Sequence, residues 1–143
     1  MSIVHILSAK GAHVETVGET ISVMVAAQRL SNKRIGALLV SDESGKISGV
    51  LSERDIVRGL ATTGASVLDQ PVKSIMTAPV ITCEEAATVQ QVMAQMTSRR
   101  IRHLPVMRGD VLVGMVSIGD LVKARIEETE QEAAALKEYI TTG

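Results

Sequence analysis

The sequence predicts an α/β fold of the α+β kind, in which two pseudo-symmetric β-α-β-β-α repeats pack as one pair and a long C-terminal helix follows. Three observations predict it: an internal repeat at a nearly constant offset, apolar spacings of three and four residues inside each copy, and an Ala- and Glu-rich end. Because each copy has only about 60 residues, neither would bury much core alone. The two copies are therefore expected to pack together.

The internal repeat is visible when the sequence is compared with itself at an offset of 66 positions. At that offset the matched pairs are Thr16 with Thr82, Val23 with Val89, Leu38 with Leu104 and Val40 with Val106. After a deletion of one residue, the phrase Ser-x-x-Asp-[Ile/Leu]-Val recurs at 52–57 and 117–122. We therefore expect repeat 1 at residues 8–66, a linker with a short helix at 67–79, repeat 2 at 80–125 and a C-terminal helical extension at 126–143.

Each copy begins with a β-prone stretch, at residues 14–17 and 80–83, and continues with a helix. Apolar residues at i, i+3, i+4 and i+7 predict these helices, namely Val23, Ala26, Ala27 and Leu30, and then Val89, Val92, Met93 and Met96. Two apolar runs around a turn predict a hairpin in each copy, at 35–52 and 103–117, with strands covered on both faces. Pro105 has no N–H to donate, so its strand is expected at a sheet edge or with a bulge.

Helices are also expected outside the repeats. Residues 120–140 predict one long helix with a heptad-like seam, formed by Val122, Ile126, Thr129, Ala133, Leu136 and Ile140. The sequence leaves open whether this helix packs back on its own body or meets another subunit. Short helices are expected at 4–10 and after Pro71, the latter with a buried side formed by Val72, Ile75 and Met76.

The repeated Ser-x-x-Asp phrase has two interpretations. A strand is expected to end at Ser52 and at Ser117, so the Ser and the acid three residues later form a capping-box pattern, worth about 1 kcal/mol. The same helix N-terminus suits a phosphorylated ligand, and Asp55 or Asp120 can accept hydrogen bonds from a ribose diol. Taken alone, the motif favours the capping role, because such boxes are common.

Basic residues distinguish the two copies. Arg102 and His103 open the second hairpin, whereas Gly36 and Ala37 occupy the matching positions of the first copy. Arg binds phosphate oxygens as a planar fork and His adds a donor, so the two copies should form chemically unequal sites. Arg54, inside the first Ser-x-x-Asp phrase, is a further candidate, although a lone Arg is more often a solvated surface charge.

Composition argues against several classes of function. The net charge is −1, and the chain has no Phe, no Trp and a single Tyr, so nucleic-acid binding is not expected. No apolar run reaches the length of a membrane span, and no metal-ligand spacing or Ser/His/Asp arrangement is present. We therefore expect no membrane insertion, no metal and no enzymatic activity. Cys83 is the only cysteine, which fits a reducing compartment such as the cytoplasm.

Several motifs together resemble the CBS domain. They are the repeat itself, the R-R-I-x-x-L-P-V run at 99–106, the G-h-h-S-x-x-D-h-V phrases at 49–57 and 114–122, in which h is a hydrophobic residue, and I-M-T at 75–77. The two copies are similar to a tandem CBS pair of the stand-alone bacterial type. The resemblance implies a non-catalytic regulatory module that binds an adenosine-containing ligand, such as AMP, ADP, ATP or NAD(H), in clefts between the repeats. It also implies a disc-shaped homodimer with an unknown protein target. Sensing of S-adenosylmethionine, or an adaptor dimer without a nucleotide, are the alternatives.

The resemblance also implies roles for individual residues. The two Asp residues would hold the ribose, the two Ser residues would contact the ligand or the helix start, and the early Thr residues would lie by the adenine. Arg102 and His103 would reach phosphate from the strand that contains Pro105. The expected ligand-binding set is Thr16, Ser52, Arg54, Asp55, Thr82, Arg102, His103, Pro105, Ser117 and Asp120. The first copy has no Pro or basic residue in the matching strand, so its site is expected to hold adenosine weakly or to be empty.

Overall fold

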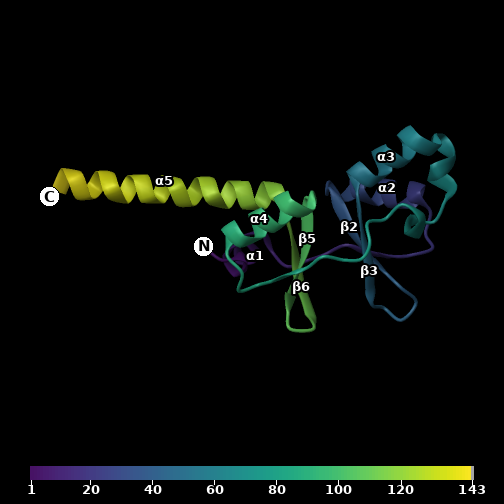
Figure 1. The fold of residues 1–143 in the computed structure, drawn as a ribbon, viewed down its shortest axis with the longest axis horizontal. Coiled ribbons are helices and arrows are strands. Elements are labelled where there is room, and N and C mark those ends of the chain that lie inside the picture. Colours follow the sequence, from purple (N-terminus) through teal and green to yellow (C-terminus); the bar gives the residue numbers. More distant parts are fainter. Residues whose placement is uncertain (143) are drawn as a thin grey trace. The chain divides into compact units, whose positions relative to one another are not determined.

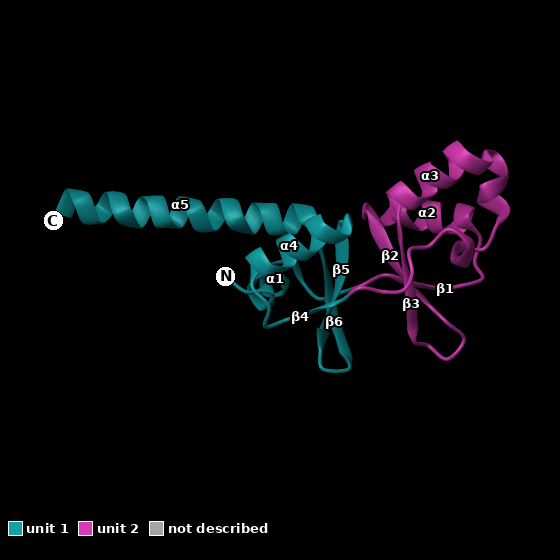
Figure 2. Ribbon diagram, in the orientation of Figure 1, with its two compact units in different colours: residues 1–13, 82–143 teal, residues 14–81 magenta. Residues whose placement is uncertain are grey.

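The computed structural model describes residues 1–142, which divide between two compact units. Unit 1 combines residues 1–13 with the chain from residue 82 onward, and unit 2 comprises residues 14–81 (Figure 2). Each unit contains one copy of the repeat, with the elements labelled in Figure 1. Each copy has the strand and helix order β-α-β-β-α, so the predicted fold class is confirmed.

Unit 2 contains the first repeat. Its elements are β1 (Thr16–Gly18), α2 (Val23–Lys33), β2 (Ala37–Ser41), β3 (Ile47–Ser52), α3 (Glu53–Thr63) and the 3-10 helices η1 (Ala65–Asp69) and η2 (Val72–Ser74). The sheet has the order β1-β2-β3, with β1 parallel and β3 antiparallel to the central β2. The short helix predicted after Pro71 is therefore present as η2, and Val72 is fully buried.

The core of unit 2 lies between its sheet and its helices. Val23, Ala26 and Leu30 form the buried face of α2, as the spacing of apolar residues predicts. Along β2 every residue from 37 to 40 is buried, so both faces of this strand are covered, also as predicted. Burying each of the Val and Leu side chains contributes about 1.5–3 kcal/mol, which makes the sheet a firm support for the helix that follows β3.

Unit 1 contains the second repeat together with both ends of the chain. Its elements are α1 (Ile3–Lys10), β4 (Cys83–Glu84), α4 (Val89–Arg99), β5 (His103–Arg108), β6 (Val111–Ser117) and α5 (Ile118–Thr142). The sheet has the order β4-β5-β6, again with a parallel first strand and an antiparallel third strand. The short helix expected at residues 4–10 is present as α1, and the long helix expected at 120–140 is present as α5.

Helix α1 packs against the second repeat, although it precedes the first repeat in the sequence. The Ile3 N–H donates to the Ala87 carbonyl at 2.9 Å, and the Ile3 side chain is fully buried. Leu7 packs so closely against β6 that a Cβ atom at Gly114 would lie 2.7 Å from its Cδ2 atom. Gly114 is therefore needed for a close approach between α1 and β6.

The segment after η2 occupies the matching place in unit 2. Gly49, which matches Gly114 in the repeat, lies against Met76, and a Cβ atom at Gly49 would lie 2.9 Å from the Met76 Cγ atom. Thr77 then exchanges two backbone hydrogen bonds with Val50, of 2.8 and 3.0 Å. Each sheet is thus covered by a segment that lies outside its own β-α-β-β-α unit.

The strand that contains Pro105 is the central one and not an edge, and it carries a bulge between Val106 and Met107, so the second of the two expected arrangements is present. In unit 2 the matching residue, Leu39, donates its N–H to the Glu15 carbonyl at 3.0 Å. Pro105 has no N–H, and pairing between β4 and β5 begins only at Val106. The central strand accommodates Pro because its neighbour on that side is two residues long.

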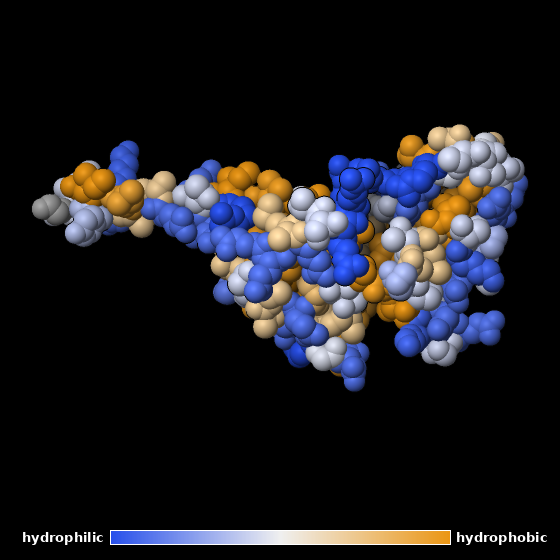
Figure 3. Space-filling model, viewed as in Figure 1, coloured by the Kyte–Doolittle hydropathy of each residue, from blue (hydrophilic) through white to orange (hydrophobic). Residues whose placement is uncertain are grey.

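Helix α5 continues beyond the rest of unit 1 (Figure 1). Leu121 and Ala124 are buried near its start, whereas every residue from 129 to 142 is exposed. Figure 3 shows hydrophobic patches on α5 separated by hydrophilic side chains, and its exposed apolar residues include Val122, Ile126 and Ile140. Within residues 1–142 no helix combines the length and the apolar character that crossing a membrane requires.

Candidate functional site

Both Ser-x-x-Asp phrases lie where a strand passes directly into a helix. Ser52 ends β3 before α3, and Ser117 ends β6 before α5. In unit 2 the Ser52 N–H donates to Asp55 Oδ2 at 2.9 Å, and the Asp55 N–H donates to Ser52 Oγ at 3.3 Å. In unit 1 the corresponding distances are 2.9 and 3.1 Å. The capping interpretation of the motif is therefore realised in both repeats.

Asp55 is the more deeply placed of the two carboxylates. The residue is only 5% exposed. Its Oδ1 atom accepts a hydrogen bond of 3.1 Å from the Thr77 hydroxyl and lies 3.5 Å from the guanidinium of Arg58. Its Oδ2 atom also accepts from the Ser52 hydroxyl, at 3.1 Å. Because the Asp55 carboxylate accepts hydrogen bonds from several donors, it holds the start of α3, the end of β3 and the segment after η2 together.

Asp120 is partly exposed and has a cationic partner. Lys10 Nζ, at the end of α1, lies 2.5 Å from Asp120 Oδ2, and the side chains are 38% and 26% exposed respectively. Burial alone would raise the pKa of the Asp120 carboxyl, but hydrogen bonds from Lys10 and Ser117 outweigh it and hold the pKa below its usual range. Asp120 is therefore an ionised acceptor at neutral pH.

Unit 1 brings the predicted basic residues to the same end of its sheet as Asp120. His103, at the start of β5, pairs with Ser117 across the sheet. The Ile118 N–H donates to the Arg102 carbonyl at 2.8 Å, and the Arg102 residue is exposed. Arg102, His103, Ser117 and Asp120 thus surround the point where β6 becomes α5.

The same backbone arrangement occurs in unit 2 without the basic side chains. Ala37 pairs with Ser52 across the sheet, and the Glu53 N–H donates to the Gly36 carbonyl at 3.0 Å. At these two junctions the units therefore have equivalent backbones, and the difference expected from the sequence lies in the side chains: Arg102 and His103 in unit 1, Gly36 and Ala37 in unit 2.

The other predicted residues lie apart from these junctions within their own units. Thr16 is exposed and pairs with Leu39, two positions along β2 from the residue that faces Ser52. Thr82 is exposed just before β4, where its carbonyl accepts a hydrogen bond from Gln95. Arg54 is exposed on the first turn of α3, and Pro105 is buried in the middle of β5.

Three residues that contact the carboxylates were missed by sequence reasoning: Lys10, Thr77 and Arg58. Thr77 belongs to the I-M-T motif, which was noted as part of the resemblance but was given no role. Lys10 is separated from Asp120 by 110 positions, and no periodicity or motif connects them. Only the packing of α1 on the second repeat could have revealed this contact.

Groups that could support other chemistry are placed unfavourably for it. The Cys83 thiol is buried, and burial raises its pKa to about 11, so it is protonated and a poor nucleophile at neutral pH. Within residues 1–142 no group of three or more His, Cys, Asp or Glu side chains is arranged to hold a metal ion.

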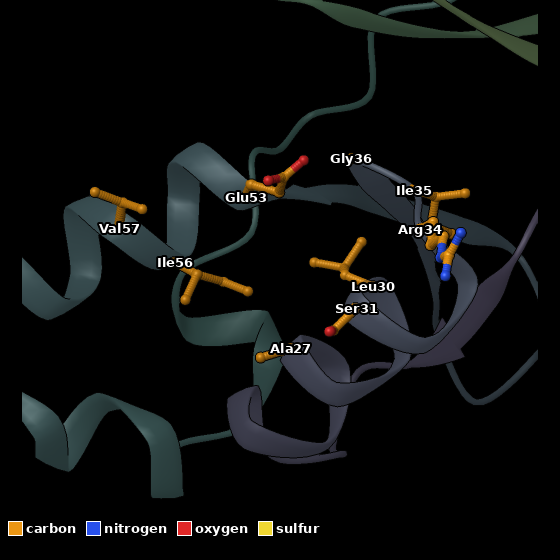
Figure 4. A pocket seen from close by; sticks show the side chains of 9 residues that line it. All are labelled: Ala27, Leu30, Ser31, Arg34, Ile35, Gly36, Glu53, Ile56 and Val57. Carbon is orange, nitrogen blue, oxygen red and sulfur yellow. The ribbon is translucent and has the colours of Figure 1, made fainter.

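A surface hollow of about 480 Å³ lies in unit 2 between the end of α2 and the start of α3 (Figure 4). Leu30, Ile56 and Val57 contribute apolar side chains, and Arg34 and Glu53 add charged ones. Asp55 does not line this hollow. The hollow is therefore separate from the carboxylate that the resemblance assigns to the ribose.

Comparisons with known proteins agree with this architecture. The model of the CBS domain family matches residues 10–62 and 72–127. A crystal structure of the CBS-domain-containing protein ATU1752 from Agrobacterium tumefaciens is 42% identical, with a TM-score of 0.84, over 87% of this chain and 92% of that one. The CBS domain pair of protein MJ0100, solved in complex with 5′-methylthioadenosine and S-adenosyl-L-methionine, is 28% identical, with a TM-score of 0.76, over 90% of this chain and 98% of that one.

A curated relative is longer than this chain. The mitochondrial CBS domain-containing protein CBSX3 from Arabidopsis thaliana is 36% identical over 122 residues, which are 82% of this chain and 59% of that protein. The similarity thus spans both repeats of this chain and a little more than half of that relative. With both copies of the repeat matched by the family model, this chain belongs to the CBS domain family.

Proposed function

We propose that this chain is a non-catalytic regulatory module that binds an adenosine-containing ligand through the carboxylates of Asp55 and Asp120. The observation that supports the proposal is the junction in unit 1, where His103 pairs with Ser117, the Arg102 carbonyl accepts from the Ile118 N–H, and the ionised Asp120 accepts from the Ser117 N–H. A carboxylate can hold the ribose diol while the guanidinium and the helix N-terminus take phosphate oxygens. AMP, ADP, ATP and NAD(H) all carry these groups.

S-adenosylmethionine is the second candidate ligand. It is supported by the MJ0100 complex, in which the related CBS pair holds S-adenosyl-L-methionine and 5′-methylthioadenosine. The third candidate is a structural role without a ligand, which the two realised capping boxes favour. We propose the cytoplasm as the place of action, since the single buried thiol suits a reducing compartment.

A thermal-shift panel tests the ligand proposal. The purified full chain is heated with AMP, ADP, ATP, NAD⁺, NADH, S-adenosylmethionine or 5′-methylthioadenosine. GMP serves as the control that tests whether the adenine base is recognised. A ligand at a hundredfold excess over its Kd stabilises by about 2.7 kcal/mol, which raises Tm by roughly 6–10 °C for a chain of this size. If no adenosyl compound moves Tm and none co-purifies by mass spectrometry, the structural role is the better account.

We also propose that the module is a homodimer, in line with the disc-shaped assembly that the resemblance implies. Val57 on α3 and Val122 on α5 are equivalent in the repeat, and both are exposed, at 64% and 41%. Each lines a surface hollow of its own unit, together with other apolar side chains. Exposed apolar side chains repeated at equivalent places are typical of a surface that another copy covers.

Charged substitutions test the dimer. Val57→Glu together with Val122→Glu should weaken dimerisation at least about tenfold, because each copy would bury two unpaired carboxylates. Sedimentation velocity measures the change. Val111→Glu, on the equally exposed hairpin of β6, is the matched control and should leave the dimer intact. A wild-type chain that sediments as a monomer at micromolar concentration would contradict the proposal.

A further inference from the structure

In the two units, the equivalent residues Asp120 and Asp55 are contacted by different side chains, although these side chains come from segments in equivalent positions. In unit 1 the segment that packs on Gly114 carries Lys10, whose ammonium contacts Asp120. In unit 2 the segment that packs on Gly49 carries Thr77, whose hydroxyl contacts Asp55. A cation that reaches the carboxylate from a separate element, Lys10, is thus present in unit 1 and not in unit 2. Unit 1 is also the unit that contains Arg102 and His103.

Arg58 does not play the same part in unit 2. It lies on the same helix as Asp55, at 3.5 Å, with its side chain 66% exposed. Water screens such a contact, and the guanidinium stays solvated whether or not Asp55 has another partner. Lys10 is closer to its carboxylate and less exposed, so the two contacts respond differently when a ligand approaches.

We propose that Lys10 is a specificity-determining residue that makes unit 1 favour phosphate-bearing adenosyl ligands over uncharged ones. This inference rests on the proposed ribose-binding role of Asp120. The Oδ2 atom of Asp120 already accepts from both Lys10 and the Ser117 N–H, so a ribose hydroxyl that reaches this carboxylate competes with the ammonium. The four-carbon stem of Lys10 lets its ammonium move to a new partner.

The nature of that new partner sets the selectivity. An uncharged nucleoside takes hydrogen-bonding capacity from Asp120 and offers the displaced ammonium nothing in return. A ligand with a phosphate supplies an anion, so the ammonium exchanges one charge-assisted contact for another. Arg102 lies next to the residue that pairs with Ser117, and it can share the same phosphate.

Isothermal titration of the full chain with AMP and with adenosine tests the proposal. Lys10→Met should weaken AMP binding about tenfold, as expected for the loss of one charge-assisted contact. Adenosine binding should stay unchanged or become tighter, because the competing ammonium is gone. A residue with a purely structural role would weaken the binding of both ligands together, so a loss for AMP without a loss for adenosine identifies selectivity.

Three further variants and a salt series make the outcome unambiguous. Lys10→Arg should retain the preference for AMP, and Lys33→Met, which removes the lysine paired with Glu15 in unit 2, should leave it unchanged. Thr77→Val should change AMP and adenosine binding in equal proportion. In the wild type, the preference for AMP should fall as salt rises from 50 to 500 mM, which needs no variant to fold.

The outcomes separate the two proposals. If the wild type binds AMP and Lys10→Met shifts AMP and adenosine equally, the role of Lys10 is wrong while the ligand-binding function stands. If the wild type binds neither compound nor any other member of the adenosyl panel, the proposed function fails and the role of Lys10 fails with it.

Discussion

Asp55→Ala should lower the free energy of unfolding by about 2–4 kcal/mol, whereas Asp120→Ala should lower it by about 1 kcal/mol. Asp55 is 5% exposed, and its removal empties a buried site and takes the acceptor from the half-buried Ser52 N–H and from the hydroxyl of the exposed Thr77. Asp120→Ala removes a similar cap, but the other partner of Asp120, Lys10, is partly exposed, and its ammonium can be solvated by water instead. Urea denaturation followed by circular dichroism measures both values.

A control and a pH series sharpen the comparison. Glu43→Ala, which removes an exposed acid in the turn between β2 and β3, should change stability by less than about 0.5 kcal/mol. The pKa of Asp120 is depressed in the folded protein, so its contribution is present above the unfolded value near 3.9 and is lost as pH falls through the folded pKa. The cost of Asp120→Ala should therefore shrink below about pH 4. Equal costs for the two Asp variants at pH 7 would contradict the difference in burial.

The architecture of each repeat was predictable because its signals are local. The spacing of Val23, Ala26 and Leu30 predicts the buried face of α2, and the Gly-containing turn at 42–46 predicts the hairpin of β2 and β3. The offset between the copies then transfers every element from one repeat to the other. Local periodicity and turn chemistry act within a few residues, so one sequence is enough to read them.

The placement of Pro105 shows where a local rule reached its limit. The absence of an N–H correctly predicts a disturbed ladder, and the strand does carry a bulge. The rule cannot tell whether the neighbouring strand shortens or is missing altogether. Here β4 shortens to two residues, and β5 stays central.

The candidate site was predictable only in part, because its contacts span large sequence separations. The Ser-x-x-Asp phrases identify the cap from four consecutive residues, and the offset pairs them. Lys10 and Thr77, by contrast, come from segments outside the β-α-β-β-α units, where no pattern indicates a contact. Asp55 and Asp120 therefore looked equivalent in the sequence, whereas the structure gives them different burial and, from the segments outside the β-α-β-β-α units, partners of different charge.

Ile3→Ala should lower the free energy of unfolding by about 3 kcal/mol, the second large effect that the structure predicts. Ile3 is fully buried in unit 1, next to the second repeat, although it lies before the first repeat in the sequence. Its removal leaves a cavity between α1 and the start of α4, whose first residue, Val89, donates its N–H to the Met1 carbonyl at 3.0 Å. Chemical denaturation of the full chain measures the loss.

Val4→Ala is the matched control, because Val4 is the next residue of α1 and is 39% exposed. It should cost less than about 0.5 kcal/mol, since little buried surface is lost. Hydrogen exchange then locates the effect: protection in Ile3→Ala should fall first at the amides of α4 and β6, and later at those of α2 and β2. A loss confined to unit 2, or equal costs for Ile3 and Val4, would mean that α1 does not complete the second repeat. Lys10 would then have no fixed support from which to reach Asp120, so this measurement also tests the premise of the selectivity proposed for unit 1.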